Sequence, residues 1–331
     1  MTVASIDGAS ASTPSTTMGA HTTTSFGDRL AERVAERESQ LVLGLDPDPA
    51  RLWPQALAGS EPQTGGGSAS PAARAAQAVA AHCALLITAA AEHCVAVKPQ
   101  VACFERLGAP GWAALVDTVA LAREHGLLVI ADAKRGDIGV TATAYAQAFL
   151  GETPTPFGPI PGLGADAMTL NPLLGGDALE PFVATARGTG AGLFILVRTS
   201  NPGAADIQER ALADGRSVSD RLADLVDEIG SEGVGRHGLS DVGAVVGATA
   251  PGRLGALRER MPHAVFLLPG VGAQGGRVEE LAAAFAAGPA SGLVSASRGI
   301  VTAHERAGGD PADAAAREAS RLRELAWRLA A

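Results

Sequence analysis

Short apolar segments recur along most of the chain. Eight of them have the length of a β-strand and are continuously apolar rather than alternating with polar residues, which is typical of parallel strands that are covered by helices. These segments are residues 41–45, 94–97, 127–131, 167–170, 193–197, 242–246, 265–268 and 293–296.

The stretches between these segments have the three- and four-residue apolar spacing of helices. The predicted helices are residues 28–38, 72–91, 111–124, 140–150, 179–186, 219–230, 252–260, 278–287 and 311–329. Eight strands that are each followed by a helix predict the α/β class and a (β/α)8 TIM barrel. A doubly wound open sheet is the alternative, but no strand is followed by the GxGxxG pattern that favours dinucleotide binding in that fold.

The pattern predicts one domain over residues 26–331, preceded by a tail. Residues 1–25 are rich in Ser, Thr, Ala and Gly, which predicts a disordered tail rather than a secretory signal. Two segments have the character of insertions into the barrel. Residues 55–70 contain three consecutive glycines and predict a flexible loop, whereas residues 151–164 contain four prolines and predict a stiff excursion.

Composition excludes several classes of function. The net charge of −9 argues against a nucleic-acid-binding protein, which needs a basic face. No apolar window of membrane-spanning length is free of charged and polar breaks, so no membrane span is expected. The three cysteines have no CxxC spacing, which disfavours a disulfide scaffold or a structural zinc site and suits a reducing cytoplasm.

Lysine is almost absent from this arginine-rich chain. Of 26 basic residues only Lys98 and Lys134 are lysines, and both lie at the carboxyl ends of predicted strands, where TIM barrels carry their active sites. An ammonium can give up a proton, whereas a guanidinium cannot. Two residues are a small sample, and chance placement is the alternative explanation.

Acidic residues accompany these lysines. Asp132 and Lys134 are two positions apart on a strand and therefore share a face, Asp137 follows closely, and Lys98 comes from the neighbouring strand. An alternating array of lysines and aspartates balances its own charge, which keeps each group ionised in a partly dry pocket. A solvated surface cluster of ion pairs is the alternative interpretation.

A phosphate site is the second candidate feature. In TIM barrels such a site forms from the loops after strands seven and eight. Here residues 269–276 are rich in glycine and offer backbone N–H groups, Gln274 offers an amide, and Arg298 offers a forked cation.

These residues together carry a resemblance. The run Asp132-x-Lys134-Arg-Gly-Asp137-Ile-Gly-x-Thr141, with the glycine-rich 269–276 loop and Ser297-Arg298-Gly299, resembles the orotidine 5′-phosphate decarboxylases, in particular their longer bacterial type. The resemblance covers roughly residues 26–330. It implies a homodimeric enzyme without metal or cofactor that converts orotidine 5′-phosphate to uridine 5′-phosphate in de novo pyrimidine synthesis.

The resemblance also implies roles for the catalytic residues. Lys134 would protonate C6 of the pyrimidine as carbon dioxide leaves, and Asp132 would lie against the substrate carboxylate. Lys98 would hold the ribose and orient Asp132. Asp137 would reach across a dimer interface into the partner's site, so that the active sites are shared.

Substrate-binding roles follow from the same resemblance. Asp46 would bind a ribose hydroxyl, and Ser200 would contact the pyrimidine. Ile138 and Thr141 would reach into the partner's site. Gln274 and Arg298 would bind the phosphate. One departure is visible, since Ala178 stands where many relatives carry a serine that touches the base.

Two alternative functions remain. Hexulose-phosphate synthases and keto-gulonate-phosphate decarboxylases share the Asp-x-Lys-x-x-Asp pattern but use Mg²⁺, and they would need a further acidic ligand, for which Glu105 and Asp177 are the nearest candidates. A barrel that only binds a nucleotide is the other alternative, although binding alone would not need two lysines and two aspartates together.

Overall fold

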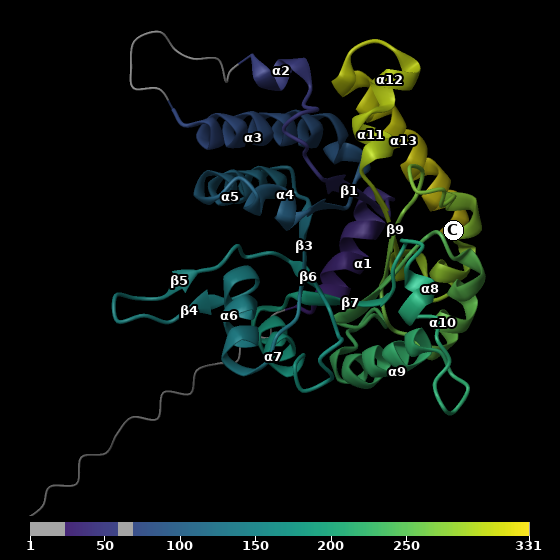
Figure 1. Cartoon of the computed structure of the whole chain (residues 1–331). Helices are drawn as coiled ribbons and strands as arrows, with labels where there is room; N and C mark the ends of the chain where they lie inside the picture. The colour runs from purple at the N-terminus through teal and green to yellow at the C-terminus, as the bar shows by residue number, and fades with distance from the viewer. Residues whose placement is uncertain (1–23, 59–68, 331) are drawn as a thin grey trace, which may run out of the picture.

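A closed parallel barrel forms the centre of the computed structural model, which describes residues 24–58 and 69–330 (Figure 1). Its strands run in the order β1-β10-β9-β8-β7-β6-β3-β2 and confirm the predicted TIM barrel. The strands are β1 (Leu41–Leu45), β2 (Ala96–Pro99), β3 (Leu128–Arg135), β6 (Ala167–Leu170), β7 (Gly192–Arg198), β8 (Val242–Val246), β9 (Phe266–Pro269) and β10 (Gly292–Ala296).

Helices surround this barrel, and most of them lie where the apolar spacing predicts them. The longer ones are α1 (Phe26–Arg37), α3 (Pro71–Ala90), α5 (Ala109–Glu124), α6 (Gly139–Phe149), α7 (Glu180–Thr189), α9 (Val218–Gly230), α10 (Leu254–Arg260) and α13 (Pro311–Ala330). Shorter helices lie in the loops, namely α2 (Pro54–Leu57), α4 (Val101–Glu105), α8 (Ala204–Ile207), α11 (Arg298–Val301) and α12 (Ala303–Ala307).

The prediction of one helix over residues 278–287 is wrong. This segment forms two 3₁₀ turns, Val278–Glu280 and Ala282–Phe285. Its buried residues are Val278, Leu281, Ala284 and Phe285, of which the first three recur every three residues. A three-residue repeat places side chains in line on a 3₁₀ helix but not on an α-helix.

The two insertions differ in how they are built. Of residues 55–70, the first three belong to α2 and residues 59–68 lie outside the described residues, as do residues 1–23 of the predicted tail. Residues 151–164 contain the antiparallel strands β4 (Glu152–Thr153) and β5 (Ile160–Pro161), which form a hairpin. Ser25 caps α1, the first helix of the described residues, by accepting the Asp28 N–H at 3.3 Å.

Helix α1 packs against the amino-terminal ends of the strands, opposite the candidate site. Its side chains Phe26, Leu30 and Val34 join a buried cluster with residues from the inside of the barrel. The Phe26 ring contacts the Phe194 ring edge to face at a centroid distance of 5.8 Å. Gly192 permits this contact, because a Cβ there would lie 2.3 Å from the Phe26 ring.

Helix α3 is unusually apolar for its length. By length and hydropathy alone, residues 71–93 could cross a membrane, but 50% of the relevant window is buried inside the structure. Val79, Cys83 and Leu86 pack into the layer between the strands and the helices, as the core helix of a globular barrel does.

The Phe26 contact yields a prediction for stability. Phe26→Ala should lower the free energy of unfolding by about 3–5 kcal/mol, because it leaves a cavity against Phe194 that the closed barrel cannot fill by collapse. Urea unfolding followed by circular dichroism measures the change. Leu212→Ala, at a side chain that is 38% exposed, is the control and should cost less than about 1 kcal/mol. Equal losses in both variants would contradict this role of α1.

Candidate active site

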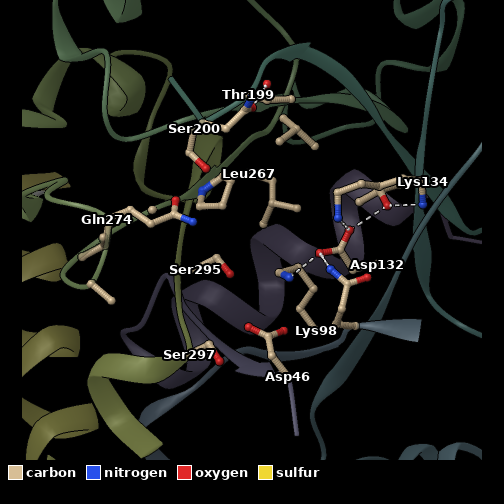
Figure 2. Close-up of a pocket in the computed structure, with 18 of the residues that line it drawn as sticks. Asp46, Lys98, Asp132, Lys134, Thr199, Ser200, Leu267, Gln274, Ser295 and Ser297 are labelled. Carbon is tan, nitrogen blue, oxygen red and sulfur yellow. Dashed lines mark hydrogen bonds and ion pairs between the residues drawn. The ribbon is translucent and has the colours of Figure 1, made fainter. Parts of the chain in front are cut away.

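A pocket of about 390 Å³ opens at the carboxyl ends of the strands (Figure 2). The strand-end residues predicted from the sequence gather there. Its polar lining comprises Asp46, Lys98, Gln100, Asp132, Lys134, Thr169, Thr199, Ser200, Asn201, Gln274, Ser295, Ser297 and Arg298. Leu196, Val245 and Leu267 form its apolar floor.

Asp132 is the centre of the polar network on one wall. Its Oδ2 accepts hydrogen bonds from the Lys98 ammonium at 2.5 Å and from the Gln100 amide at 3.2 Å. Its Oδ1 accepts the Lys134 ammonium at 2.5 Å and the Thr169 hydroxyl at 3.0 Å. Four side-chain donors thus fix a single carboxylate: Lys98, Lys134 and Thr169 lie on three strands, and Gln100 directly follows β2. The dashed lines in Figure 2 trace these contacts.

The charges of this network stabilise one another. Burial by itself would raise the pKa of Asp132, but the ammonium groups of Lys98 and Lys134 hold that pKa well below its usual range. Burial by itself would lower the pKa of Lys98, yet Asp132, and Asp46 further away, keep that pKa above its ordinary value. The site therefore holds an ionised carboxylate between two cations at neutral pH.

The backbone at Lys134 is unusual. Its φ is 48°, in the left-handed region, and the register between β3 and β6 shifts between Ala131 and Arg135. The Thr169 hydroxyl accepts the Lys134 N–H at 2.9 Å and so holds this turn. Such a conformation is costly for a residue other than glycine and persists where the surroundings enforce it, which is common at active sites.

The two lysines differ in their access to solvent. The Lys98 side chain is 8% exposed, whereas the Lys134 side chain is 41% exposed. Lys98 is therefore confined to Asp132, while Lys134 also faces the open part of the pocket. Both lysines line the pocket, but Lys134 has the wider access to a ligand and to water.

The opposite wall carries the predicted phosphate loop. Figure 2 shows Ser200 and Gln274 across the pocket from Lys98, Asp132 and Lys134. The loop turns at Gly270, whose φ of 102° favours glycine, and a Cβ there would crowd Ser200. Arg298 lines the same pocket from the start of α11. The pocket thus has anionic and cationic groups on one side and a loop of neutral donors with an arginine on the other.

Three of the predicted site residues do not line this pocket. Asp137, Ile138 and Thr141 lie beyond Lys134, where β3 leads into α6. Asp137 accepts the Ile138 N–H at 2.8 Å, and the Ile138 side chain is 60% exposed. Within one chain these residues lie outside the lining of the pocket that their sequence neighbours build.

Comparison with known proteins identifies the relationship. Residues 39–316 match the model of the orotidine 5′-phosphate decarboxylase / HUMPS family. The chain belongs to this family. It is 46% identical to the orotidine 5′-phosphate decarboxylase of Rhodopirellula baltica over 68% of this chain and 73% of that protein. It is 41% identical to that of Deinococcus radiodurans over 84% of this chain and 89% of that protein.

A solved structure agrees with this assignment. The orotidine 5′-monophosphate decarboxylase of Leishmania donovani superposes with a TM-score of 0.67 at 32% identity, over 92% of this chain and 99% of that one. The family resemblance that the sequence motifs indicate is therefore confirmed.

Sequence reasoning missed two residues of the network around Asp132. Gln100 directly follows the Lys98-Pro pair, and Thr169 is the one hydroxyl within an otherwise apolar strand. A polar residue inside a buried strand is the signal that could have revealed Thr169, because its hydroxyl needs a partner. Ala178, the departure from the family pattern, is buried and lies outside the pocket lining.

The acids considered for a metal site lie elsewhere. Glu105 pairs with the Arg135 guanidinium, and Asp177 is not part of the pocket lining. Among residues 24–58 and 69–330, no three or more His, Cys, Asp or Glu side chains gather closely enough to hold a metal ion.

The lowered pKa of Asp132 predicts how stability depends on pH. A carboxyl whose pKa is lower in the folded state than the unfolded value of about 3.9 stabilises the fold above that value. This contribution is lost as the pH falls through about 3.9 toward the folded pKa. The difference in unfolding free energy between the wild-type protein and Asp132→Asn should therefore shrink below about pH 4.

Urea unfolding at a series of pH values from neutral to acidic measures this difference. A difference that stays constant on acidification would contradict the ionised state assigned to this carboxylate.

Proposed function

We propose that this protein decarboxylates orotidine 5′-phosphate to uridine 5′-phosphate in pyrimidine synthesis, without metal or cofactor. The activity named for its relatives supports this proposal. The observation that carries it is the array of Lys98, Asp132 and Lys134 on one wall of a pocket whose other wall is a phosphate-type loop. The cytoplasm is the compartment expected for such an enzyme.

Lys134 stabilises the negative charge that develops on the substrate during the reaction. When the bond from C6 to the carboxylate breaks, the electron pair stays on C6 in the plane of the ring, and no cofactor absorbs it. The Lys134 ammonium stabilises this developing carbanion and then transfers a proton to C6. Carbon dioxide leaves, and the neutral amine regains a proton from water, to which the half-exposed side chain has access.

Asp132 fixes the geometry of this step. Its carboxylate holds the Lys134 ammonium at 2.5 Å and is itself fixed by Lys98, Gln100 and Thr169. A substrate carboxylate bound beside Asp132 is repelled by this fixed negative charge, and the repulsion ends once carbon dioxide has left. Lys98 acts as the permanent counter-charge and contacts the ribose.

Binding groups far from C6 hold the substrate in place. Gln274 and Arg298 bind the phosphate, Asp46 binds a ribose hydroxyl, and Ser200 contacts the pyrimidine. All four line the pocket. Binding energy gained at the phosphate can drive closure of the 269–276 loop and so position the base against Lys134.

A second copy of the chain completes the site in this proposal. Asp137, Ile138 and Thr141 lie outside the lining of their own pocket, and all three are at least partly exposed and so available to a partner. A two-fold axis would place them in the partner's site and return the same residues from the partner. The enzyme would then be a homodimer with shared active sites.

The assay for this function is the loss of ultraviolet absorbance of orotidine 5′-phosphate with purified protein. Lys134→Ala should reduce turnover by roughly 10⁴-fold or more, because both charge stabilisation and the proton donor are lost. Lys134→Arg should be similarly inactive, since its guanidinium keeps the charge but does not release a proton. Calorimetry should still detect binding of uridine 5′-phosphate to both variants.

Two results would contradict the proposal. Retained turnover in Lys134→Ala would refute the role of this residue. Wild-type activity that disappears with EDTA, or no activity on this substrate, would instead favour the Mg²⁺-dependent members of the family.

The shared site can be tested by mixing two inactive variants. Lys134→Ala and Asp137→Ala each damage both sites of their own homodimers. In a hybrid dimer, one site carries both changes and the other carries neither. Refolding an equal mixture should restore about a quarter of the wild-type rate, since half of randomly formed dimers are hybrids with one intact site. A mixture no more active than its components would show that each site is built from one chain.

A further inference from the structure

The β4–β5 arm, defined as residues 151–164, is an exposed structured feature that the proposed reaction does not use. Figure 1 shows it extending away from the barrel beyond α6. Phe157 at its tip is 100% exposed, and Ile160 is 57% exposed. An aromatic side chain held fully in water has a free-energy cost that a packing partner would remove.

The arm is nevertheless held in a defined shape. At the tip, the Thr155 hydroxyl donates to the Gly158 carbonyl at 2.6 Å and accepts the Phe157 N–H at 3.1 Å. Four prolines restrict the backbone around these bonds. The side chain of Phe157 is therefore presented by a stiff turn, and little entropy would be lost if a partner surface covered it.

The base of the arm is joined to the end of α6. The Leu163 N–H donates to the Ala148 carbonyl and the Ala165 N–H to the Phe149 carbonyl, both at 2.8 Å. Because α6 also begins just after Asp137, one helix connects the segment proposed to enter a partner's site with the arm. The helix spans roughly 16 Å, at 1.5 Å for each of its 11 residues.

This whole region is almost without charge. Residues 138–165 contain a single charged side chain, Glu152, whereas the chain average of 18% would give about five in 28 residues. On α6 the exposed side chains include Val140, Thr141, Thr143 and Ala144. Depletion of charge with an aromatic anchor is the composition of the buried centre of a protein interface.

We infer that the β4–β5 arm packs against a second copy of this chain and extends the dimer interface that begins at Asp137. This inference rests on the dimer of the proposed function and adds a contact that lies outside its active site. A second copy is the occupant because the arm and the outer face of α6 are continuous with that interface. An uncharged surface can also meet its own copy across a two-fold axis without repulsion between like charges.

Phe157→Glu tests the inference. The side chain makes no intramolecular packing contact to lose, so the fold should persist, which circular dichroism verifies. Sedimentation equilibrium should show a dimer weakened by roughly 10-fold to 100-fold, because an anchor aromatic is replaced by two buried charges across the axis. Phe157→Ser should weaken the dimer less, since it adds no charge.

Leu212→Glu is the matched control. Leu212 is an exposed apolar residue on the loop between α8 and α9, away from the arm, and its change should leave the dimer affinity unaltered. Equal effects of the Phe157 and Leu212 substitutions, or none from Phe157→Glu, would overturn the inference. A wild-type chain that remains monomeric at all concentrations would overturn it as well.

The same experiment separates this inference from the proposed reaction. A wild-type dimer that turns over orotidine 5′-phosphate, with Phe157→Glu equally dimeric, would refute the arm contact and leave the reaction standing. A wild-type dimer without turnover, which Phe157→Glu dissociates, would refute the reaction and support the arm contact.

Discussion

The pairing of one buried carboxylate with two ammonium groups is the interaction on which the rest of the site depends. Burial alone raises the pKa of Asp132 and lowers the pKa of Lys98, because it disfavours both charges. Together they remain ionised, and Lys134 completes the cluster at the edge of solvent. Removing Asp132 leaves both ammonium groups without this partner, whereas removing either lysine leaves the carboxylate paired with the other, so Asp132 is the member on which the cluster depends most.

The barrel is what brings this cluster together. Lys98 and Asp132 come from β2 and β3, and Thr169 comes from β6, which is the next strand around the barrel. Parallel strands deliver their carboxyl ends to one rim, so residues far apart in sequence converge there without any special loop. The excursion that contains β4 and β5 interrupts the chain between β3 and β6 but not the order of the strands.

Much of this arrangement follows from the sequence because it rests on local patterns. Residues 41–45, 167–170 and 242–246 form strands with the predicted ends, since each apolar run stops at a polar residue or a glycine. The proximity of Asp132 and Lys134 is also confirmed, but through a left-handed Lys134 rather than regular strand alternation. That conformation depends on Thr169, a long-range contact that no local pattern contains. For the same reason residues 278–287 form 3₁₀ turns, since their packing against α10 and α13 is also a long-range contact and overrides their helical propensity.

The closure of the barrel has a consequence for the order in which the site can form. Strand β1 pairs with β10, which joins Leu41 to Val294. Asp46 follows the first of these strands, and Arg298 follows the last. A nascent chain leaving the ribosome can assemble the lysine cluster of β2 and β3 early, but its substrate pocket has no phosphate side until nearly the whole chain has been made. Contacts of such long sequence separation are slow to form, so the anion-binding wall should be the last part of the site to mature.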